Sequence, residues 1–241
     1  MRCANRTALT FAPRAEGGGG GPTVGMVTQI TPGEVAEYAA TGAAVNAAYA
    51  ERHGYDYLIV TSDMVPTGWD KRYGKIWILK ALLAASTLDY FFWLDADAVV
   101  VDHDWSIARS LAGRYPDAEI VVCREANLET NNLMNSGAML LRNSPWMARF
   151  MDEWLDHPDT HTVGAPDQVI FDQLYAADAL GVRARTVILP ATAFNSEPPF
   201  YSTFTSPAQQ PVIHLMGDAA EVRRRIFDRM FHGMCAAGAG A

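Results

Sequence analysis

The sequence has 241 residues, of which 49% are hydrophobic and 19% are charged. This apolar content supports a folded core and excludes intrinsic disorder, collagen and a coiled coil as the main state of the chain. The 19 Lys and Arg residues against 27 Asp and Glu residues give a net charge of −8. That charge repels nucleic acid and anionic lipid, so an anionic ligand needs a local basic patch or a metal ion.

Small residues mark the two ends of the chain. The glycine run at 17–21 predicts a flexible leader over residues 1–21, a domain over 22–235 and a frayed tail over 236–241. No apolar run reaches the roughly 18 residues that span a bilayer, so we expect no transmembrane segment in this chain.

The three cysteines are odd in number and far apart, which excludes a disulfide framework and a zinc cluster.

Strand-like and helix-like segments alternate in the N-terminal half. We predict strands over residues 23–28, 57–60 and 90–94, and helices from Pro32 to a stop at Gly54 and over 75–86. The first helix begins with a capping box that ends at Glu34. A strand–helix–strand start of this kind favours a parallel sheet.

The C-terminal half predicts further elements of both kinds. They are a short helix ending at 111, strands over 119–124, 138–141 and 182–189, helices over 144–155 and 166–176, loops over 127–137 and 190–211, an apolar pair at 212–213, and a last helix carrying Arg223 to Arg225. The pattern predicts a single α/β domain with a mostly parallel central sheet and flanking helices.

Two carboxylates, Asp95 and Asp97, follow the apolar run 90–94 with Ala96 between them. Ligands of open α/β sheets bind beyond the carboxyl ends of such strands, and two carboxylates at this spacing suit one hard cation. The structural alternative is an ordinary turn, in which Asp is common. A rival function is an aspartyl phosphotransferase, but that chemistry favours Gly or Thr after the pair, and residues 98–100 are Ala, Val and Val.

Polar residues elsewhere can complete such a site. His214 follows an apolar strand-like run, and a neutral imidazole there can join two carboxylates at a metal, although a lone His is more often structural. Gly217 permits close approach of a phosphate, and the arginines from Arg223 onward can compensate its charge. Lys75 sits at a helix start, where a positive charge suits an anionic ligand or simply solvent.

Two further groups of polar residues have both a ligand-binding and an ordinary structural interpretation. The run 135–137, Asn-Ser-Gly, suits hydroxyl-rich ligands or a turn into the next strand. Asp167 and Gln168 begin a helix, where Asp is an ordinary first-turn residue.

The order of these segments resembles the retaining GT-A galactosyl-, mannosyl- and xylosyltransferases that carry a DxD motif. The resemblance covers roughly residues 23–230, and Asp167-Gln168 stands where that family has an Asp-Gln or Glu-Gln pair. The blocks that carry it are Lys75-Ile76, Trp93 to Ala98, Asn135 to Trp146, and His214 to Gly217. In this sequence Asp218 follows Gly217 and basic residues begin only at Arg223, which departs from the family pattern.

The resemblance implies a Rossmann-like GT-A fold and a set of site residues. It implies that Asp95, Asp97 and His214 hold a divalent metal, most often Mn²⁺. It implies a nucleotide-sugar site formed by Lys75, Asp95, Ala96, Asn135, Ser136, Gly137, Gly217 and Arg223. Asp167 and Gln168 would then be the catalytic pair beside the donor sugar, and the Golgi lumen or Golgi membrane would be the compartment.

The sequence therefore predicts a hexosyl- or pentosyltransferase that uses a nucleotide-diphosphate sugar and a glycan or glycoprotein acceptor. A UDP-sugar is the favoured donor and GDP-mannose the alternative. The competing function is a nucleotide-sugar-binding module without catalysis. An inverting enzyme needs a carboxylate base on the acceptor side, for which Asp167 is the best-placed candidate, while its neighbour Gln168 cannot be a base. Because the resemblance implies retention, we expect retention at the anomeric carbon.

Overall fold

The computed structural model describes residues 21–30, 36–61, 65–126, 131–164, 166–197, 210–217 and 219–238. The capping box and all of the expected leader except Gly21 lie outside these residues. The strands within them are β1 (Val24–Gln29), β2 (Asp56–Val60), β3 (Tyr90–Leu94), β4 (Ala98–Val100), β5 (Ile120–Arg124), β6 (Met134–Arg142), β7 (Thr186–Leu189) and β8 (Val212–His214). The α-helices are α1 (Ala36–His53), α2 (Gly74–Ala85), α3 (Pro145–Leu155), α4 (Pro166–Ala176) and α5 (Ala220–Gly238). Short 3-10 or π turns are η1 (Lys71–Tyr73), η2 (Ala108–Ala112), η3 (Pro158–His161), η4 (Ala179–Arg185) and η5 (Ala191–Ala193). No helix within these ranges combines the length and the apolar character that crossing a bilayer requires.

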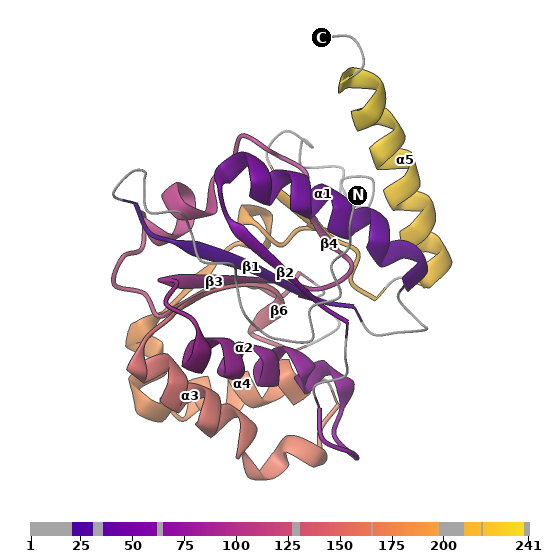
Figure 1. Cartoon of the computed structure of the whole chain (residues 1–241). Helices are drawn as coiled ribbons and strands as arrows, with labels where there is room; N and C mark the ends of the chain where they lie inside the picture. Colours follow the sequence, from indigo (N-terminus) through magenta and orange to yellow (C-terminus); the bar gives the residue numbers. More distant parts are fainter. Residues whose placement is uncertain are drawn as a thin grey trace.

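Six of the described strands form a central sheet in the order β2-β1-β3-β6-β5-β7. β1 pairs in parallel with β2 and β3, and β5 pairs in parallel with β7, whereas β6 runs antiparallel to both of its neighbours. Figure 1 shows α2, α3 and α4 covering one face of this sheet, with α1, β4 and α5 on the other. The expected α/β fold with a mostly parallel sheet and flanking helices is confirmed.

The buried centre of the sheet is β3, which explains its unbroken apolar sequence. Phe91 and Trp93 pack into the cluster under α2 and α3, while Phe92 and Leu94 pack into the cluster on the opposite face. All five residues of β3 are buried. A strand covered on both faces needs apolar residues at every position, and its polar successors must therefore lie at the sheet edge.

Two expected boundaries were wrong. The strand expected at 138–141 begins at Met134, so the end of the expected polar loop belongs to β6. The β5–β6 pairing extends past a bulge between Val122 and Cys123, and this continuation keeps the polar residues in the sheet. The strand expected over 182–189 begins only at Thr186, because Leu180 and Gly181 adopt left-handed backbone angles within the preceding turn η4.

A second, two-stranded sheet of β4 and β8 was not expected from the sequence. β4 pairs antiparallel with β8 and brings Ala98 opposite His214. The side chain of Asn46 in α1 fixes β4 from the other side: its Nδ2 donates to the Ala98 carbonyl at 3.0 Å, and its Oδ1 accepts from the Val100 N–H at 2.9 Å. This small sheet determines where the segment between β3 and β4 lies.

Candidate metal and nucleotide-sugar site

The segment 95–97 is a tight turn between two fixed strands. The Asp95 N–H donates to the Gly137 carbonyl at 2.8 Å, and the Ala98 N–H donates to the Asp95 carbonyl at 2.9 Å. The Leu215 N–H donates to the Asp97 carbonyl at 3.0 Å, which ties the turn to the residue that follows β8. Main-chain hydrogen bonds therefore hold both carboxylates at the carboxyl end of β3.

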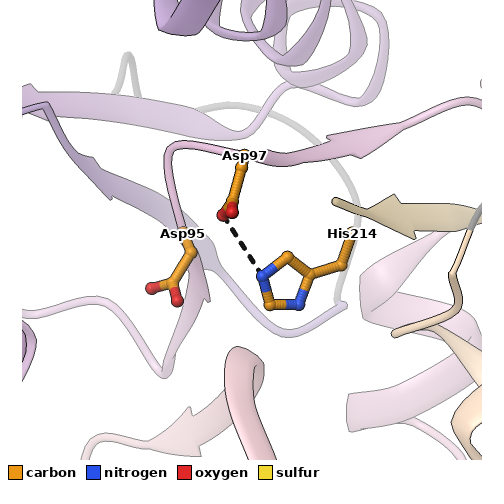
Figure 2. A group of neighbouring side chains, drawn as sticks. All are labelled: Asp95, Asp97 and His214. Carbon is orange, nitrogen blue, oxygen red and sulfur yellow. Dashed lines mark ion pairs between the residues drawn. The ribbon is translucent and has the colours of Figure 1, made fainter. Parts of the chain in front are cut away.

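The side chains of Asp95, Asp97 and His214 converge at this turn. One ligand atom from each of the three lies within 4.8 Å of the other two. Figure 2 shows the Asp97 carboxylate pointing at the His214 ring, and Oδ1 lies 3.2 Å from Nε2. Two carboxylates and an imidazole suit a divalent cation such as Mn²⁺, so the expected ligand set fits a metal at this position.

His214 is held from its far side. Its Nδ1 lies 2.9 Å from Oδ1 of the buried Asn195, whose Nδ2 donates to the main-chain oxygen of Asn135 at 3.2 Å and to its side-chain oxygen at 3.0 Å. Gly137 lies against the ring so closely that a Cβ at this position would overlap it. An amide that hydrogen-bonds the outer ring nitrogen in this way fixes the orientation of the ring, and it leaves Nε2 as the nitrogen directed at Asp97.

The pKa values of Asp97 and His214 are shifted in opposite directions. Burial would raise the pKa of Asp97, but His214 and Arg223 outweigh it, and the pKa is lowered. Burial would lower the pKa of His214, but Asp97 outweighs it, and that pKa is raised. Arg223 Nη2 lies 2.7 Å from Asp97 Oδ2. The last helix thus brings a basic residue to the carboxylate despite the distance of Arg223 from Gly217 in sequence.

Lys75 is buried at the centre of a second cluster. Its Nζ lies 3.0 Å from Asp95 Oδ1 and 3.1 Å from Asp167 Oδ2, and it donates to Ser136 Oγ at 2.9 Å. Burial would lower the pKa of Lys75, but the two carboxylates outweigh it and raise the pKa, so the amine stays charged. Lys75 thus contacts Asp95 of the expected metal set as well as Ser136 and Asp167, which the resemblance assigned to the nucleotide-sugar site and the catalytic pair.

Within the described part of the chain, one of the two Asp167 carboxylate oxygens is hydrogen-bonded and the other is not. Ser136 Oγ donates to Asp167 Oδ2 at 2.5 Å, while Oδ1 is buried and makes no hydrogen bond to any described residue. A buried carboxylate oxygen is costly to leave unpaired. Asp167 Oδ1 is therefore an acceptor suited to a ligand hydroxyl.

Gln168 is fixed by its amide nitrogen. Nε2 donates to Glu125 Oε2 at 3.0 Å and to the Met134 carbonyl at 3.2 Å. The same oxygen of Glu125 accepts from Asn135 Nδ2 at 2.9 Å. Both hydrogens of the Gln168 amide are engaged, which leaves its carbonyl oxygen for other partners.

Sequence reasoning missed Glu125 and Asn195. Glu125 directly follows β5, so the rule that placed Asp95 at the end of β3 also applies to it. Asn195 lies in the expected loop 190–211, and no pattern around it distinguishes it from an ordinary loop asparagine.

Most of the expected site residues are brought together. Contacts link Lys75, Asp95, Asp97, Asn135, Ser136, Gly137, Asp167, Gln168, His214 and Arg223, directly or through Glu125 and Asn195. Two of the expected residues offer no polar side chain to this network. Ala96 packs with apolar residues beside Tyr38, and Gly217 is exposed with a φ of 77°.

Comparisons with known proteins bear on the family and the fold. Residues 26–115 match the galactosyl transferase GMA12/MNN10 family, and this match contains Lys75, Asp95 and Asp97. Galactomannan galactosyltransferase 1 of Cyamopsis tetragonoloba is 27% identical over 112 residues, 44% of this chain and 25% of that protein. The probable alpha-1,6-mannosyltransferase MNN10 of Saccharomyces cerevisiae is 25% identical over 181 residues, 63% of this chain and 46% of that protein.

A probable glycosyltransferase 7 of Oryza sativa subsp. indica is 29% identical over 126 residues, 48% of this chain and 27% of that protein. The matched part of this chain thus spans about a quarter of the length of two of these curated relatives, 27% of the Oryza sativa protein and 25% of the Cyamopsis tetragonoloba protein.

Solved glycosyltransferases share the fold. One that is involved in glycosylation of the major capsid of PBCV-1 superposes with a TM-score of 0.68 at 16% identity, covering 86% of this chain and all (100%) of the other. The galactosyltransferase LgtC superposes with a TM-score of 0.52 at 14% identity, covering 85% of this chain and 94% of the other. The expected resemblance is confirmed: this chain has the GT-A glycosyltransferase fold, and it is similar in sequence to galactosyl and mannosyl transferases of the GMA12/MNN10 family.

Proposed function

We propose that this chain is a metal-dependent glycosyltransferase that moves a hexosyl or pentosyl unit from a nucleotide-diphosphate sugar to a glycan or glycoprotein acceptor. The observation that carries the proposal is the convergence of Asp95, Asp97 and His214 at the carboxyl end of β3. Similarity to galactosyl and mannosyl transferases supports the reaction class. A UDP-sugar is the favoured donor, with GDP-mannose as the alternative.

The proposed metal is Mn²⁺, held by Asp95, Asp97 and His214. When bound, a divalent metal of this kind acts as a Lewis acid that compensates the charge developing on the leaving diphosphate. Asn195 holds the imidazole in the orientation that presents Nε2 to the site. A net charge of −8 makes a local cation necessary for an anionic donor, and this carboxylate–imidazole set is suited to supply it.

The donor sugar is assigned to the cluster around Lys75. Asp167 Oδ1 is a buried acceptor that no described residue hydrogen-bonds, which suits a sugar hydroxyl. Lys75 and Ser136 hold the other Asp167 oxygen, so the carboxylate is preorganised before a ligand arrives. The contact between Lys75 and Asp95 joins this sugar region to the metal region.

We further propose that the transfer retains anomeric configuration. Asp167 is the best-placed carboxylate for a base, but Lys75 and Ser136 already engage its Oδ2, an arrangement that suits a carboxylate binding donor hydroxyls. Glu125 and the Met134 carbonyl hold the Gln168 amide nitrogen, which directs the carbonyl oxygen to be the group that faces developing positive charge. The donor's own leaving diphosphate then accepts the acceptor proton. The Golgi location implied by the resemblance stays a prediction.

A ligand panel with and without Mn²⁺ tests the proposal. A ligand that binds only the folded state raises the melting temperature in proportion to RT ln(1 + [L]/Kd), so UDP, GDP, UDP-sugars and GDP-mannose can be ranked directly. The Asp97→Asn variant should lose the metal-dependent shift, and the exposed Asp117→Asn variant should keep it. A binding module without catalysis would give the same shifts but release no sugar from the donor, which a product assay distinguishes.

A further inference from the structure

The two oxygens of Asp97 have different cationic partners. Oδ1 faces His214 Nε2, while Oδ2 lies 2.7 Å from Arg223 Nη2. Arg223 comes from α5, and Asp97 comes from the turn before β4, so the contact joins two segments far apart in sequence. Both side chains are mostly shielded from solvent, at 19% exposure for Arg223 and 10% for Asp97.

Arg223 is held in place by more than this one ion pair. Its Nε donates to the Leu215 carbonyl at 2.9 Å, and its Nη1 donates to the Tyr38 hydroxyl at 3.2 Å. The guanidinium carbon also lies 5.3 Å from the centre of the Tyr38 ring, in a cation–π contact. Contacts in several directions distinguish Arg223 from Arg225, which is exposed and, among the described residues, pairs with Glu221 one helical turn away.

Each carboxylate of the ligand set thus already has a fixed cation. Lys75 pairs with Asp95, and Arg223 pairs with Asp97. A divalent ion entering between these carboxylates meets two positive charges a few ångströms away, and such charges interact strongly in a poorly hydrated site. The charge balance changes when a diphosphate arrives, because its oxygens match the planar fork of an arginine.

We propose that Arg223 is a built-in counterion of the metal site, which pairs with Asp97 in the nucleotide-free protein and with the diphosphate in the complex. Divalent metal alone then binds weakly, and metal and nucleotide strengthen each other's binding because the nucleotide takes Arg223 from Asp97. The inference rests on the proposed metal and nucleotide site, and it adds a reason for the two ligands to bind together.

The variant Arg223→Met tests this with a readout that needs no turnover. Electron paramagnetic resonance measures free Mn²⁺, and hence the Kd for Mn²⁺, with and without UDP; a parallel series uses GDP. In the absence of nucleotide, the variant should bind Mn²⁺ about tenfold more tightly than wild type, because a fixed positive charge beside the site is removed. The ratio of the Mn²⁺ Kd without and with nucleotide should fall by about tenfold or more, since coupling between two ligands is reciprocal.

Arg225→Met is the matched control, because it removes the same charge from the same helix at an exposed position. It should leave both Kd values within about twofold of wild type, as expected for a screened surface charge. Tyr38→Phe removes one hydrogen bond to Arg223, so it should move both quantities in the direction of Arg223→Met by a smaller factor.

Equal or weaker binding of Mn²⁺ alone by Arg223→Met, with nucleotide-dependent binding of Mn²⁺ intact in wild type, would overturn the counterion role. In that case Arg223 serves to orient Asp97. Failure of wild type to bind Mn²⁺ even with UDP or GDP would overturn the metal site itself, which is the failure of the proposed function. The two failures are therefore distinguishable in one set of titrations.

Discussion

Gly137 and His214 approach so closely that a side chain at the first would occupy the ring position of the second. A Cβ built on Gly137 would overlap the imidazole at Cε1, Nδ1 and Nε2. Gly137 lies in β6 and His214 in β8, so the close approach fixes the distance between the central sheet and the small second sheet. Position 137 therefore requires glycine, because the His214 ring leaves no room for a side chain.

Gly137→Ala should therefore move the His214 ring and weaken the metal site. We expect Mn²⁺ affinity in the presence of nucleotide to fall by about 10- to 100-fold, the range typical of lost ligand orientation. Calorimetric titration measures it. Gly164→Ala is the control, since a Cβ there would meet nothing within 4 Å. Wild-type affinity in Gly137→Ala would show that His214 is not a ligand.

The pH dependence of metal binding should follow His214. Its pKa is raised because Asp97 outweighs burial, so the protonated ring adds stability below the unfolded pKa of about 6.5, and this stability is lost as pH rises through the folded pKa. Only neutral imidazole coordinates, so Mn²⁺ affinity should rise with pH and binding should release a proton below the folded pKa. Calorimetry in buffers of different ionisation enthalpy measures that proton.

The His214→Gln variant should bind Mn²⁺ with nucleotide more weakly and without the histidine-dependent rise. Retention of the wild-type pH profile in this variant would make His214 a structural residue.

Asp172 gives a stability prediction independent of any ligand. Burial raises its pKa to about 6, opposed by a hydrogen bond from the Leu133 N–H and assisted by Glu125. A carboxyl with a folded pKa above its unfolded value of about 3.9 binds its proton more tightly in the folded state, so stability is lost as pH rises from about 4 to 6. Asp172→Asn removes this loss and keeps an acceptor for Leu133.

We expect Asp172→Asn to raise the free energy of unfolding at pH 8 by about 1 kcal/mol, a figure reduced for partial exposure, and to leave it unchanged at pH 4. Urea denaturation at both pH values measures the difference. Asp117→Asn, at an exposed turn, is the control and should have no effect. A gain of equal size at both pH values would exclude the titration of Asp172 as its cause.

The sequence predicted the parts of the fold that follow from local pattern. The run 90–94 is apolar at every position because β3 is covered on both faces, and this made both the central strand and the position of Asp95 and Asp97 predictable. The pairing of β4 with β8 was not predictable, because each has three residues and neither has a period to recognise.

The side-chain contacts across the site could not be predicted from local sequence pattern either. Arg223 reaches Asp97 only because α5 packs against α1 after β8 has entered the small sheet. Asn195 reaches His214 through a tertiary contact between a loop and β8. Such contacts depend on how elements pack, and neither residue type nor spacing encodes them.

Gln168 should affect turnover more than donor affinity. Its fixed amide presents a carbonyl oxygen, and such a dipole stabilises positive charge that exists mainly in the transition state. Gln168→Ala should lower kcat by about 100-fold and change the Kd of the donor less than about threefold. Glu125→Gln should lower kcat less, because the Met134 carbonyl still holds the amide. Equal losses in kcat and donor affinity would instead make Gln168 a simple binding residue.

The stereochemical outcome decides between the two roles open to Asp167. If Asp167 binds donor hydroxyls through Oδ1, which has no hydrogen-bond partner among the described residues, it is not the acceptor-side base, and we expect the product to keep the donor's anomeric configuration. Proton NMR of the product formed first, recorded before mutarotation, gives the configuration directly. Asp167→Asn should then weaken donor binding yet leave the configuration of the residual product unchanged. A product of opposite configuration would refute retention and assign the base to Asp167, in which case Asp167→Asn should abolish turnover while the donor still binds.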